Sequence, residues 1–95
     1  MQNNIDPNFN EDIENIRVIH KKCLAVISSC KTKSQIKSAE VYFRLAERQL
    51  NTKYPKSPKY SKHRVILERV IKNIDLFLSI SRRRIRHYAY YAQRK

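Results

Sequence analysis

Apolar side chains recur at alternating steps of three and four residues along most of the 95-residue chain. In the first stretch this spacing is followed by Ile16, Ile19, Cys23, Val26 and Cys30. Residues three and four apart share one face of an α-helix, so the pattern predicts an amphipathic helix over residues 10–30. Asn10 is the predicted N-cap, because acids follow it at positions 11, 12 and 14.

A second helix is predicted over residues 33–53. Thr32 and Gln35 have the spacing of a capping box, which marks a helix start. The apolar positions that follow at steps of three and four are Ile36, Ala39, Phe43, Ala46 and Leu50. Residues 51–61 contain Pro55 and Pro58 and are the predicted linker. Proline is typical of the first turn of a helix, so we expect the third helix to begin at Pro58.

The third helix is predicted to run from residue 58 to about residue 93 without a breaker. Its apolar positions are Leu67, Ile71, Ile74, Leu78, Ser81, Ile85 and Tyr88. A helix of this length measures roughly 50 Å, against about 30 Å for each of the first two. We therefore expect an all-α, up-down-up bundle of three helices, in which the long third helix extends beyond the bundle. The predicted organisation is a polar arm (1–9), a bundle (10–78, with 58–78 from the third helix) and a basic, aromatic helical extension (79–95).

Composition narrows the choice of function. The chain has no glycine, which excludes glycine-rich phosphate loops and dinucleotide-binding fingerprints. Cys23 and Cys30 lie two helical turns apart, roughly 10 Å, which is too far for a disulfide and predicts two reduced thiols in the core. We see no signal peptide and no apolar run long enough to span a membrane. We therefore expect a soluble protein without membrane insertion, located in the cytoplasm, the nucleoid or nucleus, or a virus particle.

Charge gives the main indication of a partner. The chain has 21 Lys and Arg against 8 Asp and Glu, a formal net charge of +13. Asp75 is the last acid, and the final twenty residues hold six Lys or Arg. A protein surface with charges of mainly one sign repels itself, and a bound polyanion relieves this repulsion. Nucleic acid is the commonest polyanionic partner of a basic protein. The leading interpretation is a small, non-catalytic protein that binds the nucleic-acid backbone with low sequence specificity, with DNA and RNA both open.

The candidate nucleic-acid-binding residues form two groups. On a helical wheel, basic and aromatic residues of the extension lie opposite its apolar face, a combination that suits phosphates and bases. The predicted phosphate ligands of the extension are Arg82, Arg83, Arg86, Arg94 and Lys95. The predicted stacking or hydrogen-bonding residues are His87, Tyr90 and Tyr91. The linker supplies a second basic patch of Lys53, Lys56, Lys59 and Lys62.

An alternative is a structural subunit of a larger assembly, such as a viral or phage particle or a ribonucleoprotein. In that interpretation the extension docks on a protein partner or on a second copy of the chain. The candidate interface residues are Ile85, Tyr88, Ala89 and Ala92. No Ser-His-Asp arrangement, carboxylate pair or set of four convergent metal ligands is visible, so we expect no enzyme activity, no cofactor and no metal.

Overall fold

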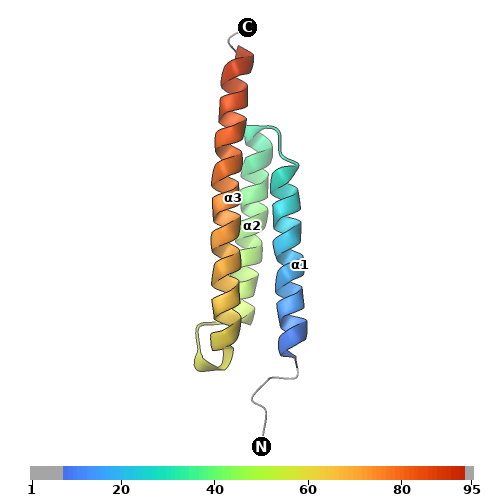
Figure 1. The fold of residues 1–95 in the computed structure, drawn as a ribbon, viewed down its shortest axis with the longest axis vertical. Coiled ribbons are helices and arrows are strands. Elements are labelled where there is room, and N and C mark those ends of the chain that lie inside the picture. The colour runs from blue at the N-terminus through green and yellow to red at the C-terminus, as the bar shows by residue number, and fades with distance from the viewer. Residues whose placement is uncertain (1–7, 94–95) are drawn as a thin grey trace, which may run out of the picture.

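Three α-helices form an up-down-up bundle in the computed structural model (Figure 1). The structure describes the backbone of residues 8–93 and the side chains of residues 8–86. Within that range the helices are α1 (Phe9–Ser28), α2 (Lys33–Lys53) and α3 (Ser61–Gln93). Each helix packs against the other two. The predicted fold class is confirmed.

Local capping signals predict the start of α2 better than the start of α1. The capping box is formed, because the Gln35 backbone N–H donates to Thr32 Oγ1 at 3.1 Å and the Thr32 N–H donates to Gln35 Oε1 at 3.2 Å. The prediction of Asn10 as the N-cap of α1 is wrong. The cap is Asn8, whose carbonyl accepts from the Asp12 N–H at 2.9 Å. The cap therefore lies two residues earlier than predicted, and α1 begins at residue 9 instead of residue 10.

The linker contains a short helical turn of its own. Pro58 begins the 3₁₀-helix η1 (Pro58–Tyr60), and α3 starts only at Ser61. The Tyr60 N–H donates to the Ser57 carbonyl at 3.0 Å, which closes this turn. The expected start of the third helix at residue 58 is therefore three residues too early, because the proline opens a 3₁₀ turn before the α-helix.

The core is formed by most of the predicted apolar positions and by some that were not predicted. The predicted Ile19, Val26, Ala46 and Ile71 are only partly buried and pack against it. The buried apolar side chains are Ile13, Ile16, Cys23, Ile27, Cys30, Ile36, Ala39, Phe43, Leu50, Tyr54, Leu67, Val70, Ile74, Leu78 and Ile85. Complete burial of one large aliphatic or aromatic side chain contributes roughly 1.5–3 kcal/mol. Cys23 and Cys30 are buried and free, as the sequence predicts.

The lower end of the bundle, where α3 begins, is organised around a buried histidine. His63 is 2% exposed, and its Nε2 lies 3.0 Å from Asp12 Oδ2. Its ring stacks on Tyr54 at 5.0 Å between centroids and meets Phe9 and Tyr60 edge-on. Burial, with the nearby Asp12 carboxylate adding to it, raises the pKa of Tyr54 to about 12. This cluster joins the start of α1, the end of α2 and the start of α3.

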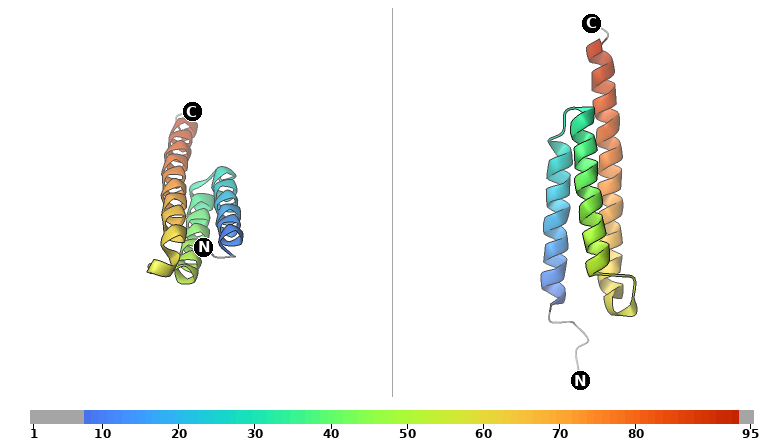
Figure 2. Two further views of the ribbon diagram at one scale, coloured as in Figure 1. Left: turned by 60° about the horizontal axis from the view of Figure 1, so that its bottom comes forward. Right: turned by 180° about the vertical axis from the view of Figure 1, so that it is seen from behind.

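Helix α3 stays packed beyond the point that the sequence suggests. Ser81 is 1% exposed and Ile85 is 6% exposed, so the packed bundle continues into the segment predicted as the extension (79–95). The connection between α1 and α2 reaches α3 at the level of Ile85. Among the described residues, only the last turns of α3 extend past this connection, and both views in Figure 2 show this free end of α3. Seven residues of α3, 87–93, measure about 10 Å.

Candidate nucleic-acid interface

Acidic and basic side chains are unevenly distributed along the bundle. The sequence has no Asp or Glu between Glu14 and Glu40, and none after Asp75. Because α1 ends and α2 begins where α3 extends past them, these acid-free segments meet at one end of the molecule (Figure 1). We call the exposed cations there the basic end: Lys31, Lys33, Lys37, Arg83, Arg84 and Arg86. None of the six forms an ion pair among the side chains that the structure describes.

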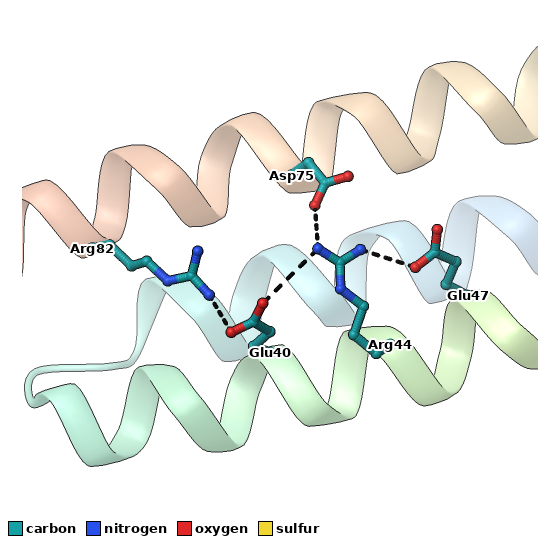
Figure 3. A network of polar contacts seen from close by, with 5 residues as sticks. All are labelled: Glu40, Arg44, Glu47, Asp75 and Arg82. Carbon is teal, nitrogen blue, oxygen red and sulfur yellow. Dashed lines mark hydrogen bonds and ion pairs between the residues drawn. The ribbon is translucent and has the colours of Figure 1, made fainter.

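A network of ion pairs between α2 and α3 lies next to the basic end (Figure 3). Arg44 donates to Glu47 at 2.9 Å and to Asp75 at 2.8 Å. Arg82 donates to Glu40, and this hydrogen bond lowers the pKa of that carboxyl. The three acids of this network, Glu40, Glu47 and Asp75, pair with Arg44 and Arg82 and not with the cations of the basic end. Two guanidinium groups share three carboxylates, so the network keeps one net negative charge.

Two pockets flank Ile85 where α3 passes the other helices. The first, of about 370 Å³, lies toward the end of α1 and is lined by Ser28, Cys30, Lys31, Arg84 and Ile85. The second, of about 260 Å³, lies toward the start of α2 and is lined by Lys33, Ile36, Lys37, Arg82, Ile85 and Arg86. Each pocket thus has an apolar floor at Ile85 and contains basic side chains from two different elements.

In the first pocket, burial and the charge of Arg84 have opposite effects on the pKa of Cys30. Burial raises the pKa of the Cys30 thiol, and the positive charge of Arg84 acts in the opposite direction. The thiol donates to the Val26 carbonyl at 3.2 Å. Cys30 is therefore a protonated core thiol that lines the same pocket as Arg84.

The start of α2 adds to the positive potential of the second pocket. The first turn of an α-helix carries a partial positive charge from its unpaired N–H groups. Lys33 and Lys37 lie one turn apart in this segment and both are exposed. The Thr32–Gln35 capping box satisfies part of the local hydrogen bonding, so the positive potential here comes mainly from the two lysines and Arg86.

The structure separates the predicted phosphate ligands into two roles. Arg83 and Arg86 are exposed at the basic end. Arg82 instead pairs with Glu40 across the α2–α3 contact. The side chains of six further candidates lie outside the described ones: His87, Tyr88, Ala89, Tyr90, Tyr91 and Ala92. Arg94 and Lys95 lie outside the described residues altogether, and the candidate interface residue Ile85 is buried within the chain.

The linker lysines lie at the opposite end of the bundle from the basic end (Figure 1). Lys62 and Arg83 are 21 residues apart on the same helix, which separates them by about 30 Å. Lys53 Nζ lies 5.6 Å from the Tyr54 ring centre, and Lys59 Nζ lies 5.3 Å from that of Tyr60. The structure therefore does not bring the two predicted basic patches together.

Sequence reasoning missed the contribution of Lys31, Lys33 and Lys37. Their signal is the acid-free segment between Glu14 and Glu40, combined with the up-down-up topology. That topology places the α1–α2 connection beside the C-terminal half of the third helix, so lysines there and arginines of α3 share one end.

Metal and membrane roles find no support within the described part of the chain. No group of three His, Cys, Asp or Glu side chains is placed to hold a metal ion among these residues. Within residues 8–93, no helix combines the length and apolar character that crossing a membrane requires. Comparisons with models of protein families, with curated proteins and with solved structures found no match.

Proposed function

We propose that this protein binds nucleic acid through phosphate contacts at its basic end, without catalysis and without a cofactor. The observation that carries the proposal is the convergence of six exposed cations from the α1–α2 connection, the start of α2 and α3. Guanidinium groups bind phosphates in bidentate geometry, and lysines contribute point charges. A protein with this function acts where nucleic acid is present, in the cytoplasm, in the nucleoid or nucleus, or inside a virus particle.

The number of cations sets the expected salt dependence. Each phosphate neutralised on a DNA duplex releases condensed counterions, so the logarithm of the binding constant falls linearly with the logarithm of salt concentration. If all six cations contact phosphates, the slope is about −5. Arg82 is excluded from this count because it is paired with Glu40.

We expect low sequence specificity from the described side chains of the basic end. Sequence is read mainly by side chains that reach base edges, while phosphate contacts only position the protein. Gln35, the amide side chain nearest to these cations in the sequence, accepts hydrogen bonds from the Lys31 and Thr32 backbone N–H groups. It is therefore committed to the capping box.

The test is a fluorescence-anisotropy titration with labelled single-stranded RNA and labelled duplex DNA, at salt concentrations from about 50 to 300 mM. The test variant changes Arg83, Arg84 and Arg86 to Glu. The control changes Arg48, Arg69 and Lys72 to Glu, three exposed cations outside the basic end with the same total charge change. We expect the first variant to lose at least about tenfold in affinity and the control less than about threefold. Equal losses would show that only net charge matters and would contradict the proposal.

A second candidate function, a subunit of a larger assembly, is favoured by exposed apolar side chains. Val41 and Leu45, one turn apart on α2, are 60% and 52% exposed, and Tyr42 lies beside them. Ile85 is not available for such a contact, because it is buried within the chain. An assembly role predicts that Val41→Asp with Leu45→Asp abolishes association in sedimentation velocity and leaves nucleic-acid affinity unchanged. A monomeric wild-type protein that binds nucleic acid tightly would favour the first candidate.

A further inference from the structure

The two pockets lie on opposite flanks of α3. Arg84 and Arg86 are two residues apart, and at 3.6 residues per turn their side chains leave the helix about 200° apart. Arg84 lines the pocket toward the end of α1, and Arg86 lines the pocket toward the start of α2. Ile85 lies between them and faces the core. The helix therefore passes between two separate basic pockets.

A different segment completes each flank. Lys31, from the α1–α2 connection, joins Arg84 on one side. Lys33 and Lys37, from the first turns of α2, join Arg86 on the other side. Within the part of the chain that the structure describes, only α3 continues beyond this level, as far as Gln93. Figure 2 shows the end of α3 continuing alone past the other two helices. Just below this free end, one basic pocket lies on each flank of α3.

This shape matches the major groove of duplex DNA. The groove is about 12 Å wide and about 8.5 Å deep, and it is bordered on both sides by a phosphate backbone. An α-helix with its side chains is about 10–12 Å in diameter, and the free end of α3 is about 10 Å long. The major groove of an RNA duplex is deep and narrow, so it does not admit a helix in this way. A single strand offers only one backbone.

We propose that the free end of α3 enters the major groove of duplex DNA end-on, while the two basic pockets bind phosphates of opposite strands. This inference rests on the proposed function and names its partner as duplex DNA. It requires both flanks, whereas general attraction between a cationic surface and a polyanion does not. It also requires contact with the floor of the major groove, which backbone binding alone does not produce.

The first experiment compares three labelled probes of one sequence: duplex DNA of about 16 base pairs, one and a half helical turns, the corresponding RNA duplex, and the single DNA strand. We expect duplex DNA to bind at least about tenfold more tightly than either of the others. Dimethyl sulfate methylates guanine N7, which faces the major groove. Bound protein should therefore protect guanines at the site, and a minor-groove ligand such as netropsin should not displace it.

The second experiment tests the flanks separately. One variant changes Lys31 and Arg84 to Glu, and the other changes Lys33 and Lys37 to Glu. A control with the same charge change, Arg48→Glu with Arg69→Glu, lies away from α3's free end, and circular dichroism confirms that all variants fold. We expect either flank variant to lose at least about tenfold in affinity for duplex DNA and the control to lose less than about threefold.

The outcomes separate this inference from the proposed function. Tight binding of all three probes without protection of guanine N7 would overturn groove insertion and leave phosphate binding standing. A flank variant that binds duplex DNA as well as the control does would overturn the two-sided arrangement. Failure to bind any of the three probes would overturn the proposed function and this inference together. Preference for duplex DNA, protection of N7 and dependence on both flanks would establish it.

Discussion

The position of Arg82 makes a prediction that separates structural from ligand-binding arginines. Arg82 donates to Glu40 across the α2–α3 contact (Figure 3). Its neighbour Arg83 is exposed. Arg82→Gln should therefore lower the stability of the bundle and leave nucleic-acid affinity nearly unchanged. Arg83→Gln should lower nucleic-acid affinity and leave the stability of the bundle nearly unchanged. The coupling between Arg82 and Glu40 is measured by a double-mutant cycle with Glu40→Gln.

The expected magnitude follows from the exposure of the pair. The Arg82 and Glu40 side chains are 40% and 32% exposed, so solvent screens much of their attraction. Exposed ion pairs contribute about 0.2–1 kcal/mol, and membership of a network that includes Arg44 places this pair near the upper end. We expect a coupling free energy of about 0.5–1 kcal/mol. At about 4–8 °C per kcal/mol for a domain of this size, the melting temperature should fall by about 2–8 °C.

The coupling should depend on pH with a definite sign. The hydrogen bond from Arg82 lowers the pKa of Glu40 below its ordinary value of 4.5. A carboxyl whose pKa is depressed by folding contributes stability above its unfolded pKa and loses it as pH falls through the folded value. The coupling should therefore be constant from neutral pH down to about pH 5 and disappear in stronger acid.

The assay is urea unfolding followed by far-UV circular dichroism, for the wild type, both single variants and the double variant. Low salt should increase the coupling and high salt should reduce it. A coupling indistinguishable from zero at neutral pH and low salt would refute the assignment of Arg82 to the α2–α3 contact. Arg82 would then return to the set of candidate phosphate ligands.

Three further predictions concern the core. Phe43, at 1% exposure, is the largest apolar side chain of α2's core face, and Phe43→Ala should cost about 3–5 kcal/mol in urea unfolding; a loss below about 1 kcal/mol would contradict its burial. The pKa of Tyr54, raised to about 12, should appear in an ultraviolet titration as one tyrosine that ionises at higher pH than the others, and Tyr54→Phe should remove this component. The free energy of unfolding should also fall as pH rises above 10. A titration without the high-pH component would contradict the raised pKa. Burial raises the pKa values of Cys23 and Cys30, so iodoacetamide should alkylate both far more slowly in the folded than in the urea-unfolded protein; similar rates would show that the thiols are open to solvent.

The sequence predicts those features that depend on local patterns. The spacing of apolar residues located all three helices, and the Thr32–Gln35 capping box placed the start of α2 correctly because all of its bonds lie within a few residues. The predicted N-cap of α1, Asn10, lies two residues after the observed cap, Asn8. Both residues are suitable N-caps, and the local sequence does not choose between them.

Contacts between different helices could not be predicted from local sequence patterns, because they depend on how the helices are aligned with one another. Nothing in the run from Arg82 to Arg86 shows which arginine faces Glu40, which is 42 residues away from Arg82. His63 was missed in the core because it is polar, although it lies four residues before Leu67 on the same helical face. The basic end itself requires knowledge of which segments meet at one end of the bundle.

The most direct test of the account is to map the nucleic-acid contact on the folded protein. Isotope-labelled protein would be titrated with duplex DNA of about 16 base pairs, and backbone amide shifts would be followed by nuclear magnetic resonance. The account predicts that the largest shift changes fall in residues 28–37 and 82–93, the segments that meet at the basic end. Changes confined to the linker at residues 53–62, or the absence of any change at saturating DNA, would contradict it.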